Sequence, residues 1–209
     1  MTAPNTSTSG GYLEPFSTPP LFDDAFEDFL HGVVVGITGL EPQKVRPRLQ
    51  VANAGVMPRI PEPDISWCAL GLQTSQALGQ RTVKIHDGTG LGSDTSISFE
   101  RTTALFSFYG LTPWAIAGQF ADGLRVPQNR EELTLAGVGL QRIGDRRNVG
   151  AIGPNNVAMR RVDLEIGFDR AIVRTYRVLN LLRATGSVQY RAGATPRDAS
   201  TTFDTEASR

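Results

Sequence analysis

The side chains that most often act as nucleophiles or general bases are scarce in this sequence. Its 209 residues include two histidines, His31 and His86, and one cysteine, Cys68. A serine or cysteine nucleophile activated by histidine would have to use one of these two imidazoles. Neither histidine lies near a known nucleophile motif, and Cys68 follows Trp67 in an apolar stretch typical of a buried thiol. We therefore expect both histidines to be structural or solvated, and the protein not to be an enzyme.

Carboxylates and glycines offer equally little chemistry. Metal sites need clustered ligands, and a single cysteine excludes a disulfide scaffold and a multi-cysteine zinc site. The pair Glu131–Glu132 lies where a helix should begin. The glycines of 88–92 lack the lysine and hydroxyl residue of a phosphate-binding loop, and Gly137 and Gly139 stand between a helix and a strand, the reverse of a dinucleotide fingerprint. These patterns predict turns or helix ends, with no metal and no cofactor.

Arginine dominates the charged residues that remain. The net charge is zero, but 19 of the 21 basic residues are arginine, and residues 140–191 hold ten of them against four acids. Residues 1–30 hold five acids and no lysine or arginine. Arginine forms bidentate pairs with carboxylates, so the two regions are candidate complementary surfaces for self-assembly. The simpler alternative is a GC-rich genome, which favours arginine codons. The candidate subunit-interface residues are Asp23, Asp24, Glu27, Asp28, Arg142, Arg146, Arg147, Arg160, Arg161, Arg174 and Arg177.

Nucleic-acid binding is a second interpretation of the same arginines, joined by Arg170, Arg183 and Arg191. Against it, the net charge is zero and no sequence signature of a known DNA- or RNA-binding module is present. On a strand, Arg161 would share a face with Asp163 and Glu165. The pattern favours a ladder of cross-strand or intersubunit ion pairs, and an arginine-rich nucleic-acid module stays as an alternative.

Three helices should frame these residues. Apolar residues recur at helical spacing from Phe22 to Val34, and the acids at the start of this helix suit the positive end of its dipole. A second helix should have Thr112 as its N-cap and end before Pro127. A short third helix should have Asn129 as its N-cap and end at Gly137.

The remaining periodicity predicts strands. In the longest one the apolar parity switches, which indicates either a bulge near 100–103 or burial of both faces at the far end. Strands on both sides of the helices predict an α+β fold, with a single mostly antiparallel sheet flanked by two or three helices. The expected strands are 67–74, 82–86, 95–109, 139–143, 159–166 and 171–179.

Composition divides the chain into one domain and two arms. Residues 1–20 and 192–209 are rich in small and polar residues, so we expect flexible arms there and a folded domain at 21–191. The apolar content rules out a wholly disordered chain. The longest apolar run, near Val33, is far shorter than the ~20 residues that cross a bilayer, and no secretory signal is expected.

Five segments occur in a familiar order. The chain contains LHGVVVGITGLEPQKVRPRLQ up to Gln50, WCALGL at Trp67, RTTALFSFYG up to Gly110, DGLRVPQNREELTLAGVGLQRIGD at 122–145 and RTYRVLNLLRATG at 174–186. This series resembles the neck and tail terminator proteins of tailed bacteriophages over roughly 21–190. The most specific parts are 123–144 and 174–180.

The resemblance implies a structural protein with a fold similar to that of tail tube proteins. Such terminators form a ring, usually hexameric, that caps the head-proximal end of the tail tube, stops its polymerisation and joins the tail to the head connector. In contractile tails the ring also holds the last sheath ring. The expected location is the phage neck or tail, after assembly in the host bacterial cytoplasm, and another neck or tail-completion component is the nearest alternative.

The genome must pass through such a ring without being held. A lumen that binds phosphate would oppose this passage. We therefore expect arginines at subunit interfaces, and acidic or neutral groups around the hole.

Overall fold

The computed structural model describes residues 4–48, 64–79, 82–152, 158–181, 183–190 and 199–206. The chain divides into two compact units, each built from separate stretches of sequence. The larger unit comprises Pro20–Arg81 and Ser98–Ile172. The smaller unit comprises Met1–Pro19, Thr82–Ile97 and Val173–Arg209.

Proline or glycine stands at several of the helix ends. The described helices are α1 (Asp23–Thr38), the 3-10 turn η1 (Pro42–Lys44), α2 (Pro113–Gly123) and α3 (Pro127–Leu135). Gly39 ends α1 with a left-handed φ of 70°. Thr112 is the N-cap of α2, as predicted. The predicted start of α3 is wrong. Proline at the first helical position lacks only an N–H that has no helical partner, so α3 begins at Pro127, and Asn129 instead donates from Nδ2 to the carbonyl of Gly123 at 2.9 Å.

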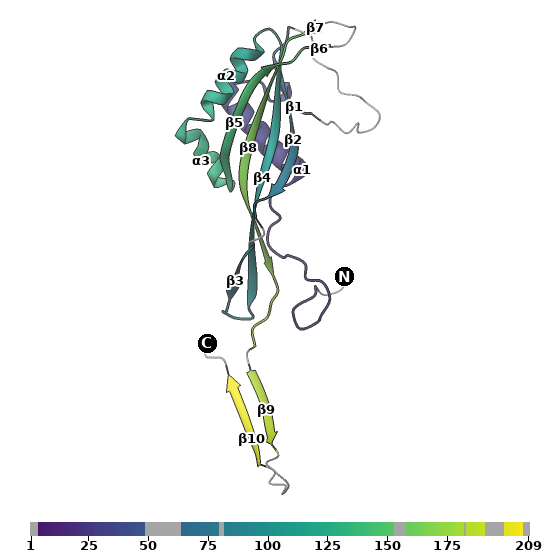
Figure 1. Ribbon diagram of the computed structural model, residues 1–209, viewed down its shortest axis with the longest axis vertical. Coiled ribbons are helices and arrows are strands. Elements are labelled where there is room, and N and C mark those ends of the chain that lie inside the picture. Colours follow the sequence, from purple (N-terminus) through teal and green to yellow (C-terminus); the bar gives the residue numbers. More distant parts are fainter. Residues whose placement is uncertain are drawn as a thin grey trace. The chain divides into compact units, whose positions relative to one another are not determined.

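The main sheet has six strands in the order β1-β2-β4-β8-β5, with β3 paired to β4 (Figure 1). The β1–β2 pair is parallel, and β2–β4, β3–β4 and β5–β8 are antiparallel, which confirms the α+β prediction. Two further antiparallel pairs are β6–β7 and β9–β10. The strands are β1 (Val45–Pro47), β2 (Trp67–Ala77), β3 (Val83–Asp87), β4 (Ser93–Tyr109), β5 (Val138–Asn148), β6 (Ala151–Ile152), β7 (Ala158–Met159), β8 (Arg161–Tyr176), β9 (Arg183–Tyr190) and β10 (Ala199–Glu206).

Two predicted strands, 159–166 and 171–179, are largely one strand, β8. The intervening Gly167-Phe168-Asp169-Arg170 resembles a turn in composition. It continues the alternation instead, because Ile166, Phe168 and Arg170 are all buried. Strand β10 lies in the C-terminal segment expected to be an arm, and its Ala199–Glu206 sequence carries too little apolar periodicity to predict it. The flexibility of both arms stays a prediction.

Of the two predicted causes of the parity switch in β4, the structure supports the burial of both faces. The bulge lies in the partner strand, since the β2–β4 register shifts between Leu72 and Thr74. At the far end of β4 both faces are covered, because Phe106 and Ser107 are both fully buried. Burial of both faces is therefore confirmed, and the bulge sits opposite the predicted position.

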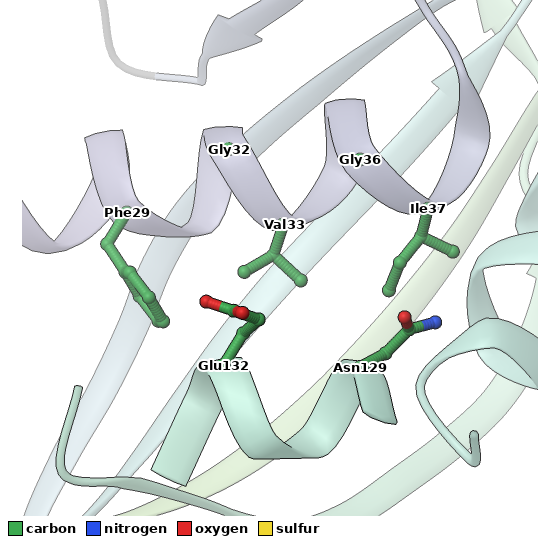
Figure 2. A pocket seen from close by; sticks show the side chains of 7 residues that line it. All are labelled: Phe29, Gly32, Val33, Gly36, Ile37, Asn129 and Glu132. Carbon is green, nitrogen blue, oxygen red and sulfur yellow. The ribbon is translucent and has the colours of Figure 1, made fainter. Parts of the chain in front are cut away.

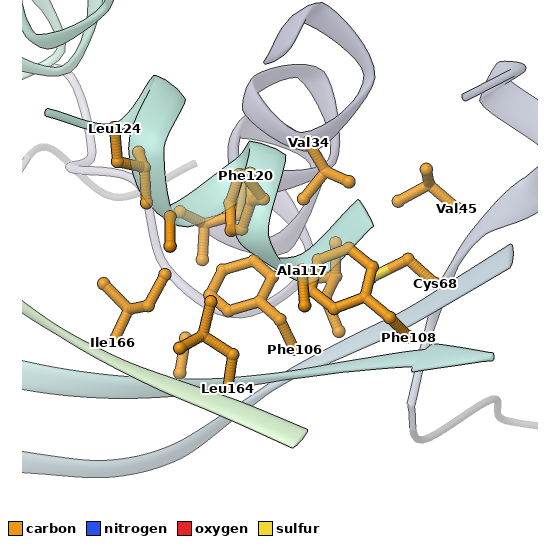
Figure 3. Close-up of a cluster of buried hydrophobic side chains, with 14 of the residues drawn as sticks. Val34, Val45, Cys68, Phe106, Phe108, Ala117, Phe120, Leu124, Leu164 and Ile166 are labelled. Carbon is orange, nitrogen blue, oxygen red and sulfur yellow. The ribbon is translucent and has the colours of Figure 1, made fainter. Parts of the chain in front are cut away.

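The core of the larger unit lies between one face of the sheet and the helices α1 and α2 (Figure 3). The Phe120 ring from α2 lies 4.9 Å from that of Phe106 and 5.7 Å from that of Phe108, between ring centroids. Phe26 from α1 meets Phe168 of β8 edge-on at 6.4 Å. Each such fully buried ring stabilises the fold by about 1.5–3 kcal/mol, so this cluster fixes both helices on the sheet.

Candidate assembly surfaces

The histidines and the cysteine occupy three unrelated environments. His31 places Nε2 2.9 Å from the carbonyl oxygen of Pro42. His86 lies in the smaller unit, with Nδ1 2.5 Å from Asp94 Oδ1 and Nε2 2.7 Å from Asn180 Oδ1. Cys68 is fully buried in the core, where desolvation raises the pKa of its thiol. None of these contacts joins a nucleophile to a base, so they support the structural interpretation of these three side chains.

The glycine patterns are turns and helix ends, as predicted. The 88–92 cluster lies in the β3–β4 turn, where Asp87 Oδ1 accepts hydrogen bonds from the backbone N–H and the hydroxyl of Thr89. Gly137 follows α3 with a φ of 70°, a conformation that other residues rarely adopt. Glu131 and Glu132 are exposed on α3, but the prediction that they lie at its start is wrong, because α3 begins at Pro127 and its first turn holds no acidic residue.

The acidic residues at the start of α1 divide into two groups. Asp23, Asp24 and Asp28 are exposed, and no ion pair to them is found in the described part of the chain. Glu27 is partly buried, and its Oε1 accepts a 3.2 Å hydrogen bond from the backbone N–H of Leu72, beside the β2 bulge. Glu27 therefore provides a hydrogen-bond acceptor for a backbone N–H of the sheet. Sequence periodicity alone does not reveal this role.

Several arginines are neutralised within the chain. Arg161 makes a bidentate pair with Asp163, with both N–O distances 2.7 Å, and Arg142 of β5 pairs with Glu165 of the adjacent β8. Two further pairs join β4 to β8: Arg101–Asp169 at 2.8 Å and Glu100–Arg170 at 3.3 Å. The predicted cross-strand ladder is thus present. Arg142 and Arg161 already have acidic partners, which makes them weaker candidates for a subunit interface.

Two other predicted interface arginines, Arg146 and Arg160, come from outside α2 and contact residues at its start. Arg146 Nη1 donates to the Trp114 carbonyl at 3.5 Å, and its guanidinium carbon lies 4.9 Å from the Trp114 ring centroid. Arg160 Nη1 donates to the Leu111 carbonyl at 3.1 Å. Both arginines are exposed, and within the described residues neither has a carboxylate in ion-pair range. Their charges are therefore available at the surface.

The remaining predicted arginines are dispersed. Arg147 is exposed on β5, beside Arg146 in sequence. Arg174 is partly buried on β8, and the guanidinium carbon of Arg177 lies 4.8 Å from the Phe16 ring centroid, both in the smaller unit. Arg191 lies outside the described residues. The predicted interface arginines are therefore divided between the two units, and their proposed common surface stays a prediction.

A shallow apolar groove separates α1 from α3 (Figure 2). Phe29, Val33 and Ile37 of α1 point toward Asn129 and Glu132 of α3, and the groove volume is about 290 Å³. Gly32 and Gly36 leave the α1 side open, because a Cβ at either position would touch nothing within 4 Å.

The described residues contain neither a membrane-spanning helix nor a cluster of metal ligands. No helix among them is long and apolar enough to span a bilayer. No group of three or more histidine, cysteine, aspartate and glutamate side chains among them is placed to hold a metal ion.

Comparison with known families decides what kind of protein this is. The family model described as phage neck terminator protein matches residues 22–192, which include the helices α1, α2 and α3 and every strand of the main sheet. The chain belongs to the phage neck terminator family. No curated protein matches it.

Family membership places this neck terminator in the neck and tail region of the phage particle. The family is structural, and its members associate with other neck and tail proteins. Two exposed surfaces are therefore the candidates for contacts with other proteins. One holds the acids at the start of α1, and the other holds the arginines that contact the start of α2.

Proposed function

We propose that six copies of this neck terminator form a closed ring at the head-proximal end of the tail tube. The ring stops tube polymerisation and presents its other side to the head–tail connector. The partners are therefore other copies of the chain, the tail tube protein, the connector and, in a contractile tail, the sheath. The family match over 22–192 carries this proposal.

The distribution of charge supports a head-to-tail ring. Each subunit of such a ring needs two different, mutually complementary patches. The exposed acids of α1 provide a negative patch, and the exposed arginines near α2 provide a positive one. The proposed interface region remains the predicted one. Its strongest members are Asp24, Asp28, Arg146 and Arg160, for which the described residues show no ion pair. Its other members are Asp23, Glu27, Arg142, Arg147, Arg161, Arg174 and Arg177.

The ion-pair ladder also bears on DNA. The genome passes through the proposed lumen, and arginines neutralised by Asp163, Glu165 and Asp169 attract phosphate less than free ones. This favours passage of DNA over retention, and it counts against a nucleic-acid-binding module.

Electron microscopy of particles made without this protein tests the proposal. Overlong tails, or tails that fail to join heads, support a terminator. Tails of normal length with incomplete heads would indicate a connector component instead. Salt-dependent binding of the purified chain to duplex DNA would support the nucleic-acid alternative.

A further inference from the structure

We propose that the start of α2 is a protein-binding surface whose occupant is the acidic start of α1 from a second copy of the chain. We name this surface the α2 anchor patch and define it as Leu111, Trp114, Arg146 and Arg160. The inference rests on the proposed self-assembly, and it adds which side chains make the contact.

The patch exposes large apolar side chains where burial is the rule. Trp114 is 50% exposed and Leu111 is 59% exposed, on either side of the N-cap residue Thr112. Tryptophan and arginine are the residue types most enriched among the few side chains that dominate binding energy at protein interfaces. An exposed tryptophan in contact with Arg146, close in sequence to the Leu111 that binds Arg160, therefore has the composition of an interface centre.

The two arginines are held in place by hydrogen bonds to backbone carbonyls, and among the described residues neither has a carboxylate partner. Arg146 stacks over Trp114 and bonds its carbonyl, and Arg160 bonds the carbonyl of Leu111. Gly118, one turn along α2, makes room for Arg146, since a Cβ there would lie 2.6 Å from its Nη1. Preset guanidinium groups lose little side-chain freedom on binding, and their remaining N–H groups suit carboxylates.

The start of α1 offers the complementary chemistry. Asp23, Asp24 and Asp28 are exposed carboxylates, and Phe22 beside them is 36% exposed. This combination of acids with an aromatic ring matches a patch that contains two arginines and a tryptophan. Charge complementarity of this kind fixes partner choice and orientation at interfaces.

The contact must come from another molecule. The start of α1 is bonded to Arg170, which donates to the carbonyl of Leu21. The α2 anchor patch includes Arg160, which directly precedes β8 and stands ten residues before Arg170. At the rise of a β-strand this separation is about 30 Å. One copy therefore cannot bring its own acids to its own patch, whereas neighbouring copies in a head-to-tail ring can.

Sedimentation velocity of the full chain over a range of concentrations tests the patch. We expect Trp114→Ala and Arg160→Glu each to weaken self-association by about 30-fold, the size typical of a central interface residue. Leu135→Ala and Arg130→Glu are matched controls, because both residues are exposed on α3, outside the patch, and should leave association unchanged. Circular dichroism verifies that each variant is folded.

A charge exchange identifies the occupant. Asp24→Arg and Arg160→Glu should each impair assembly alone, because each creates a like-charge contact between identical copies. Mixing the two variants should restore assembly with the two in alternation, since every contact is then complementary. A wild-type chain that stays monomeric, a patch variant that assembles normally, or a mixture that does not recover would each overturn the inference. Overlong tails in the absence of the protein would still support the proposed function in all three cases.

Discussion

The guanidinium carbon of Arg170 lies 4.0 Å from the centroid of the Phe26 ring, so a buried cation on β8 is stacked against the first turns of α1. The same side chain donates to the Leu21 carbonyl and pairs with Glu100 at 3.3 Å. Arg170 is only 5% exposed, and this desolvation lowers the pKa of its guanidinium. It joins α1, β4 and β8, so it holds the proposed acidic surface in position.

Replacing Arg170 by alanine should therefore destabilise the fold strongly. Removing one partner of a buried pair leaves the other charge poorly compensated, and we expect a loss of about 3 kcal/mol in the free energy of unfolding. Urea unfolding followed by tryptophan fluorescence measures it. Arg147→Ala is the control, because Arg147 is exposed and its loss should cost less than about 0.5 kcal/mol. Equal stability of the two variants would refute the role of Arg170.

The contrast between Arg170 and Arg161 shows where sequence reasoning succeeds. Alternation along one strand is enough to place Arg161 with Asp163, and the structure confirms that pair. Arg170 follows Asp169 in a stretch that resembles a turn, so its burial depends on α1, which is distant in sequence. Periodicity likewise predicts the helices α1 and α2 and the α+β class. It does not reveal the hydrogen bond of Glu27 to Leu72 or the contacts at the start of α2, because these join separate elements.

The pKa of His86 should lie above the ordinary histidine value of about 6.5. Its hydrogen bond to Asp94 is the main cause and its bond to Asn180 the second, with the charges of Asp94 and Asp87 adding to both. Only the protonated ring donates through both nitrogens. The stabilisation that protonated His86 gives by holding Asn180 is therefore fully present below about pH 6.5, and it is lost as the pH rises through the elevated pKa of His86. An NMR titration of the imidazole protons measures this.

Two variants separate the causes of the His86 shift. Asp94→Asn should return the pKa of His86 most of the way to its ordinary value, and Asn180→Ala should return it by less. The His86→Gln variant assigns the resonance, since the sequence has only one other histidine. A larger effect of Asn180→Ala than of Asp94→Asn would contradict the geometry at Asp94.

The thiol of Cys68 should be unreactive in the folded protein. It is fully buried in the core, and burial raises its pKa, which suppresses the nucleophilic thiolate. A thiol reagent should therefore label no cysteine in native buffer and one per chain in denaturant, because the sequence has a single cysteine. Rapid labelling of the native protein would indicate that the helices separate readily from β2 and expose Cys68 to solvent.

Glycine-to-alanine substitutions on the two packed helices should have opposite effects. At Gly123 a Cβ would lie 2.3 Å from Cγ2 of Ile37, and overpacking of this kind costs about 1–3 kcal/mol. At Gly36 a Cβ would meet nothing within 4 Å, and alanine in a helix interior is better than glycine by about 0.5–1 kcal/mol. We therefore expect Gly123→Ala to lower the thermal midpoint and Gly36→Ala to raise it. The cost at Gly123 should shrink in an Ile37→Ala background, because the clashing methyl is then absent. An undiminished cost in that background would mean that the contact between α1 and α2 is not what requires glycine.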